Sequence, residues 1–157
     1  MPDSLSTLKN LCKKWGGSLV EVSQTDYDKL NASSETHSEA PFTSGRLGVN
    51  YSEKRVVYSG KLDVGELIHE MGHVFASKVE PAKCPEFDFF GWEYLVAKKV
   101  GALAEWFRSS KDYCVDNQNT EFGGLSSHQQ EAVLVERVAH AKNLGLVGPK
   151  GAPKSIR

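Results

Sequence analysis

The sequence ELIHEMGHVF, residues 66–75, decides the fold of this chain, because it combines a core-facing helix with a metal-binding pattern. Apolar residues recur through it at helical spacing, which predicts a helix packed against a core. His69 and His73 are four positions apart, so both imidazoles lie on one face and can converge on one metal ion. Glu70 projects beside them, where a carboxylate can take a proton from a metal-bound water. The alternative, a surface helix that carries two histidines by coincidence, leaves the apolar stripe unexplained.

The size and composition of the chain fit one soluble globular domain over residues 1–157. Its 39% hydrophobic and 25% charged residues are ordinary for such a domain. A net charge of −1 gives no reason to expect nucleic acid or an anionic membrane as a partner. The sequence shows neither a signal peptide nor an apolar run long enough to span a membrane. We therefore expect a cytoplasmic protein.

The cysteine pattern restricts which kinds of metal site the chain can form. Cys12, Cys84 and Cys114 are an odd number, and no two of them form a C-x-x-C pair. This pattern argues against a disulfide framework and against a structural zinc site built from four cysteines.

Four segments are expected ahead of the helix that carries His69 and His73, which we call the metal helix. Their patterns predict, in order, a helix over 4–15 capped by Asp3 or Ser4 and ended by Gly16 and Gly17, a strand over 19–22, a polar mobile loop over about 31–45, and a hairpin over 46–59. The metal helix itself should begin near Leu62 or Asp63, with Asp63 or Ser59 as its cap, and stop around Lys78, because Pro81 follows.

The second half of the chain reads as two helices and a loop. A long helix is expected over about 89–109, with one face formed by Glu93, Ala97, Val100, Ala104 and Phe107. A loop should cover 111–125. A last helix should then run from Ser126 or Ser127 to about Asn143, with Ser127 and Gln130 resembling a capping box. A basic tail over about 148–157 completes the sequence.

Two histidines do not complete a catalytic zinc site, which takes a third protein ligand and leaves one position open for water. A third histidine six residues after His73 is excluded, because Val79 stands there. Glu93 shares its helix face with small and apolar residues, so it should be carried into the interior, where a carboxylate needs a strong partner. Glu86 or Asp88, in the preceding turn, is the alternative third ligand. A solvated or salt-bridged Glu93 also remains open.

The order of hairpin, H-E-x-x-H helix, loop and glutamate-bearing helix resembles the gluzincin metallopeptidases. Small domains of the ImmA/IrrE type are similar to residues 47–50 on the edge strand, 66–75 on the metal helix, and Glu93 on the next one. The resemblance implies His69, His73 and Glu93 as the ligands of one Zn²⁺ ion and Glu70 as the general base. It covers about residues 45 to 105. The residues after Glu93 depart from the family's pattern.

These observations lead to two functional hypotheses. The first is a zinc-dependent metallopeptidase, a narrow-specificity endopeptidase whose partner is a protein or peptide substrate. An extended peptide would add beside the strand that precedes the metal helix. The second is a catalytically silent zincin-fold interaction module that retains zinc. An oxyanion donor is also expected, and the available side chains, none of which is assigned, are Tyr94, Tyr113, His128 and His140.

The fold class that we predict is α+β. A small, mostly antiparallel sheet from residues 18 to 59 should pack against the metal helix and the Glu93 helix in a zincin-like arrangement. The terminal helices should complete the core.

Overall fold

The computed structural model describes residues 3–32, 37–39, 46–50, 53–76 and 86–147. The α+β class is confirmed. These residues form one sheet and six α-helices: α1 Ser4–Lys14, α2 Gln24–Ala32, α3 Val64–Met71, α4 Phe90–Val100, α5 Leu103–Ser110 and α6 Ser127–Asn143. The basic tail predicted over about 148–157 lies outside the described residues.

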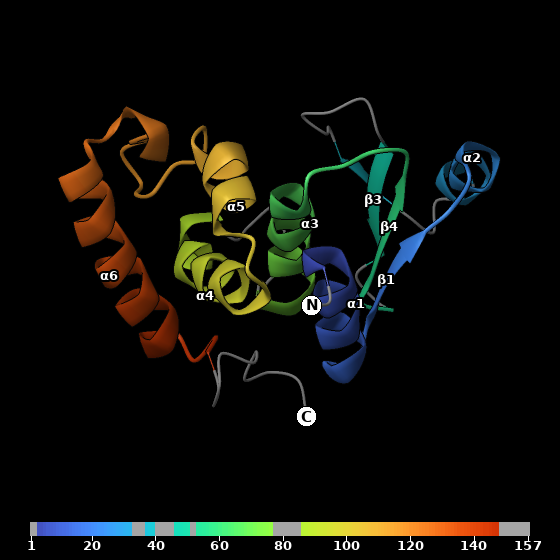
Figure 1. The fold of residues 1–157 in the computed structure, drawn as a ribbon, viewed down its shortest axis with the longest axis horizontal. Coiled ribbons are helices and arrows are strands. Elements are labelled where there is room, and N and C mark those ends of the chain that lie inside the picture. Colours follow the sequence, from blue (N-terminus) through green and yellow to red (C-terminus); the bar gives the residue numbers. More distant parts are fainter. Residues whose placement is uncertain (1–2, 33–36, 40–45, 51–52, 77–85, 148–157) are drawn as a thin grey trace.

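The sheet has four strands in the order β1-β4-β3-β2 (Figure 1). β3 (Arg46–Asn50) and β4 (Arg55–Ser59) form the predicted antiparallel hairpin, and β2 (His37–Glu39) pairs with β3, also antiparallel. β1 (Ser18–Glu21) runs parallel to β4. Two of the three strand pairings are antiparallel, so the prediction of a mostly antiparallel sheet is confirmed.

The topology corrects the predicted mode of peptide binding. β4 precedes the metal helix, but it hydrogen-bonds to β1 on one side and to β3 on the other. A central strand has no free row of backbone groups to offer a peptide. The prediction that a substrate adds beside this strand is wrong, because the short strand after α1 fills that position.

The helices lie on both sides of the sheet. Figure 1 shows α2 on one side and α3 on the other, with α4, α5 and α6 following beyond α3. The phenol of Tyr27 on α2 donates a buried hydrogen bond of 2.8 Å to the carbonyl oxygen of Leu47, which ties α2 to β3. Helix α3, which carries His69, therefore lies in the interior, between the sheet and the C-terminal helices.

The metal helix begins where the sequence predicts. The side chain of Asp63 accepts a hydrogen bond from the Gly65 backbone N–H at 3.0 Å, which satisfies one of the free N–H groups of the first turn. After Met71 the helix widens into a π-helical turn over Gly72–Ala76, called η1. Such turns often occur at functional sites. The predicted end near Lys78 lies outside the described residues.

The long helix predicted over about 89–109 is two helices, so this prediction is wrong. α4 ends at Val100 because Gly101 takes a left-handed conformation with φ of 74°. The N–H of Ala102 then bonds to the carbonyl oxygen of Ala97 at 2.9 Å, as in a glycine-capped helix end. Glu93, Ala97 and Val100 are buried on α4 as predicted, whereas Ala104, beyond the break, is exposed.

Two smaller expectations also change. The loop predicted over about 31–45 contains β2, whose pairing with β3 gives it an extended form that its polar sequence does not signal. The capping box of α6 is formed by Ser126 and Gln129, one position before the predicted pair.

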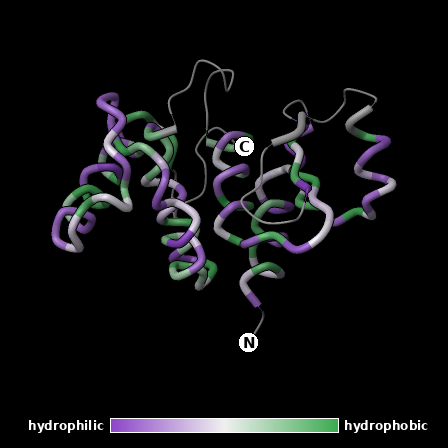
Figure 2. The backbone as a smooth tube through the Cα atoms, turned by 90° about the horizontal axis from the view of Figure 1, so that it is seen from above, coloured by the Kyte–Doolittle hydropathy of each residue, from purple (hydrophilic) through white to green (hydrophobic). Residues whose placement is uncertain are grey.

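None of the described helices is long and apolar enough to cross a membrane. Figure 2 shows hydrophilic and hydrophobic residues mixed along the backbone.

Candidate metal centre

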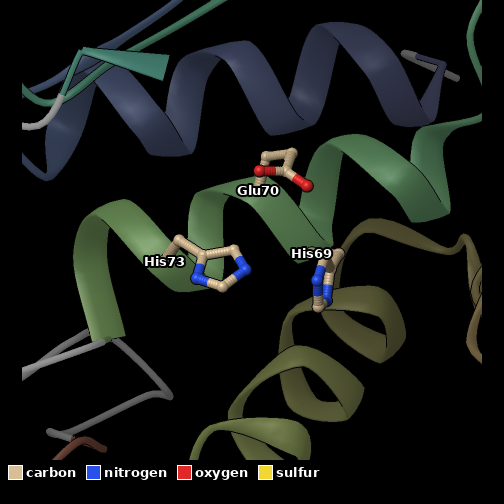
Figure 3. Close-up of side chains that lie close together, drawn as sticks. All are labelled: His69, Glu70 and His73. Atoms are coloured by element: carbon tan, nitrogen blue, oxygen red, sulfur yellow. The ribbon is translucent and has the colours of Figure 1, made fainter. Parts of the chain in front are cut away.

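The structure brings His69, Glu70 and His73 together. One potential ligand atom from each lies within 4.8 Å of the others. His69 and Glu70 are buried, with 5% and 6% of their surface exposed, and His73 is partly buried. Figure 3 shows both imidazoles on the side of α3 that faces α4, with Glu70 on the neighbouring side of the helix. The helical spacing read from the sequence therefore yields a compact cluster of two imidazoles and one carboxylate.

Phe89, immediately before α4, packs against both imidazoles. Its ring centroid lies 5.9 Å from that of His69 and 5.0 Å from that of His73. This approach requires a glycine in the motif, because a Cβ at Gly72 would lie 2.5 Å from Cδ2 of Phe89. The fully buried Phe89 ring thus forms an apolar wall of the cluster.

Glu93 enters the interior as predicted, and its exposed fraction is 0%. Its Oε2 atom lies 3.1 Å from Nδ1 of His69, and its Oε1 atom accepts a hydrogen bond of 3.1 Å from the indole N–H of Trp106. Glu93 also stands in the first turn of α4, where the positive end of the helix dipole favours a negative charge. Each oxygen of the buried carboxylate therefore has a nitrogen partner, and these two contacts offset part of the cost of burying it.

The 3.1 Å between Glu93 and His69 fits two arrangements. In one, Nδ1–H of His69 donates to the carboxylate, which leaves Nε2 with a lone pair for a metal. In the other, both atoms bind one tetrahedral zinc ion, whose donors lie about 3.3–3.5 Å apart for bond lengths of about 2.0–2.1 Å. The donor set of imidazole nitrogens and carboxylate oxygens suits zinc in both cases. Glu93 as the third ligand stays a prediction.

The alternative third ligands lie in the short 3₁₀ turn η3 (Glu86–Asp88). Asp88 is engaged with α6, since its Oδ1 atom lies 2.8 Å from Nε2 of His140. This pair gives His140 a structural partner that its sequence position did not reveal. The side chain of Glu86 lies outside the described part of the structure.

Two neighbours of the cluster could not be assigned from the sequence. Tyr113 stacks on the His69 ring, and Trp106 binds Glu93. Tyr94 packs against Trp106, with ring centroids 5.8 Å apart, and His128 is exposed on α6. The sequence offered no periodic signal for Trp106 or Tyr113, because both reach the cluster through the turn at Gly101 and the loop after α5.

Tyr113 is held by a small hairpin. The Tyr113 carbonyl oxygen accepts a hydrogen bond of 3.0 Å from the N–H of Phe122, and Val115 N–H donates to the Thr120 carbonyl oxygen at 2.9 Å. The loop predicted over 111–125 therefore has defined local structure, which places the ring of Tyr113 over that of His69.

No protein-family model matches the chain, and no curated protein or solved structure matches it either. Inferences about function therefore rest on the residues of the site.

Proposed function

We propose that this protein is a zinc-dependent metallopeptidase that cleaves peptide bonds in a protein or peptide, as a narrow-specificity endopeptidase. His69, His73 and Glu93 would hold one zinc ion, and Glu70 would be the general base. The observation that carries the proposal is the cluster in which potential ligand atoms of His69, Glu70 and His73 lie within 4.8 Å of one another. A base beside two imidazoles is the arrangement that metal-assisted hydrolysis needs.

Each residue has a distinct task in this proposal. When bound, zinc would supply a water of lowered pKa and polarise the scissile carbonyl group. Glu70 would be the group that takes a proton from the attacking water and gives a proton to the leaving amine. His69 and His73 would each present a ring nitrogen to the metal. Phe89 excludes water from the side of the two imidazoles against which it packs. Burial of Glu70 strengthens its electrostatic action, because the surrounding dielectric constant is low.

Elemental analysis of protein purified without a histidine tag tests the metal site. Wild type should carry about one zinc ion per chain, and Glu93→Ala should carry far less. Glu86→Ala is the matched control, because it removes the alternative carboxylate and should keep the zinc. Zinc lost in Glu86→Ala and retained in Glu93→Ala would overturn the proposed ligand set.

A second variant separates ligation by Glu93 from orientation of His69. Glu93→Gln keeps an oxygen that can accept from His69 but removes the negative charge. If Glu93 is a ligand, this variant should bind zinc almost as weakly as Glu93→Ala. If Glu93 only orients His69, its zinc affinity should fall about 10- to 100-fold or less.

Catalysis is tested with Glu70→Gln and a mixed library of unstructured peptides. The variant should retain zinc and lose cleavage by at least about 10²–10⁴-fold, because it lacks the proton acceptor. Wild type that binds zinc and cleaves nothing would favour the second hypothesis, an interaction module that retains zinc. In that case Glu70→Gln would leave the biological effect of the protein unchanged.

A further inference from the structure

Trp106 on α5 reaches the metal centre through Glu93. Its indole N–H donates to Oε1 of Glu93 at 3.1 Å, and Oε2 of the same carboxylate lies 3.1 Å from Nδ1 of His69. We propose that Trp106 is a positioning residue of the metal centre, which fixes the Glu93 carboxylate so that its second oxygen faces His69 and the metal position. This inference rests on the proposed zinc site, although not on peptidase activity.

The carboxylate needs such a donor because its own torsion angle does not fix it. The last side-chain torsion of glutamate has broad preferences, so the carboxylate plane can rotate. A hydrogen bond to one oxygen selects the orientation of both. The indole N–H is suited to this role, because it only donates and carries no charge that titrates. It also offsets part of the cost of burying the charge of Glu93.

Trp106 is itself firmly placed. Its exposed fraction is 0%, and other aromatic rings surround it, with centroids 5.0 to 6.1 Å away: Phe90, Tyr94, Phe107 and Phe122. On its backbone side α3 approaches closely, because a Cβ at Gly65 would lie 2.8 Å from Cα of Trp106. The indole is thus held from both sides, and its N–H keeps one direction.

Trp92 provides a matched comparison within the same core. It lies on α4 next to Glu93 and is also fully buried. Its indole nitrogen makes no hydrogen bond to any of the residues that the structure describes. Replacing either tryptophan by phenylalanine removes similar volume, but only the change at Trp106 removes a hydrogen bond to Glu93.

The test is the zinc affinity of Trp106→Phe and Trp92→Phe, measured by competition with a chromophoric chelator. Trp106→Phe should bind zinc about 10- to 100-fold more weakly than wild type, as expected when the partner of a ligand-positioning group is lost. Trp92→Phe should stay within about threefold of wild type. The Co²⁺-substituted protein should show an altered visible absorption spectrum for Trp106→Phe alone. Thermal unfolding of both variants reports how much of any change is a general loss of packing.

The outcomes separate this inference from the proposed function. Equal zinc affinities of the two variants would overturn the role of Trp106 and leave the peptidase proposal standing. A selective loss in Trp106→Phe, with wild type that cleaves no peptide, would support the role of Trp106 and overturn the peptidase. Wild type that takes up no zinc would overturn both.

A second measurement applies if Trp106→Phe does not fold. In the metal-free wild type, the ¹⁵N–¹H resonance of the Trp106 indole should differ from that in Glu93→Ala, while the Trp92 resonance should change little. An unchanged Trp106 resonance in Glu93→Ala would overturn the hydrogen bond and the inference with it.

Discussion

The imidazole of His69 stacks on the phenol ring of Tyr113, with ring centroids 4.1 Å apart and planes inclined by 24°. The two residues come from α3 and from the hairpin after α5, so the stack joins the metal helix to a separate segment. A flat ring against an imidazole restricts rotation of that imidazole. Tyr113 therefore restricts His69 at the face of its ring, whereas Glu93 lies at the Nδ1 edge of the same ring.

Shortening Tyr113 should weaken metal binding. An aromatic pair contributes about 0.5–1.5 kcal/mol beyond area burial, so Tyr113→Ala should lower zinc affinity by about two- to tenfold. Tyr113→Phe keeps the ring and should bind zinc like wild type. Chelator competition measures both. A loss as large in Tyr113→Phe as in Tyr113→Ala would show that the hydroxyl, and not the stack, matters.

Gly72→Ala should damage both stability and the site. The new Cβ would lie 2.5 Å from Cδ2 of the buried Phe89 and 3.6 Å from Cγ of Glu93. Overpacking of this kind costs about 1–3 kcal/mol, which exceeds the gain of up to about 1 kcal/mol from alanine in a helix. The melting temperature should fall by several degrees, and zinc affinity should fall with it.

The control for that change is Gly124→Ala. A Cβ at Gly124 meets nothing within 4 Å, so its melting temperature should stay close to that of wild type. If calorimetry gives the same melting temperature for Gly72→Ala and Gly124→Ala, then Phe89 does not press on Gly72 as the structure shows.

The hairpin that carries Tyr113 should lose stability in acid. The backbone N–H of Thr120, together with that of Gln118, holds the pKa of the Asp116 carboxyl below its usual value. Because the folded pKa is lower than the unfolded one, the carboxylate stabilises the hairpin above the unfolded pKa, near 4. That contribution disappears as the pH falls through the lowered folded pKa.

Amide hydrogen exchange at Thr120 measures this effect between pH 5 and pH 2, after correction for the intrinsic exchange rate. Protection in the wild type should fall over this range. Asp116→Asn keeps an oxygen acceptor without a titrating group, so its protection should vary less with pH. Equal pH dependence in the two proteins would mean that Asp116 is not the group responsible.

Cys12 should resist alkylation in the native protein. Burial raises the pKa of its thiol to about 12, so roughly one molecule in ten thousand holds the thiolate at pH 8. Cys114 is only partly buried. In a Cys84→Ser background, iodoacetamide at pH 8 should modify Cys114 first, as followed by mass spectrometry. Modification of Cys12 at the same rate as Cys114 would contradict the burial of Cys12 in the core.

Local sequence patterns predicted the parts of the fold that local interactions determine. The Asp63 cap, the hairpin of β3 and β4, and the burial of Glu93 follow from side-chain spacing and capping chemistry, which act over a few residues. That His69 and His73 lie together follows from the helical repeat alone.

Other features depend on contacts that spacing does not encode. Residues 89–109 keep a helical pattern through Gly101, and only the left-handed conformation of this glycine ends α4 and lets α5 take a new direction. This change of direction brings Trp106 to Glu93. The three-residue strand β2 exists through its pairing with β3 and has little signal of its own.

The hydrogen bonds around Glu93 have a consequence for the order of folding. They join Glu93 to residues only 24 and 13 positions away in the chain, whereas the parallel pairing of β1 with β4 must bring Ser18 to Arg55. Shorter loops cost less entropy to close, and local contacts form faster. The helices that carry the histidines and their carboxylate partner should therefore assemble before the sheet is complete. Zinc added during refolding would then meet the proposed metal site already assembled, in a chain that is not yet fully folded.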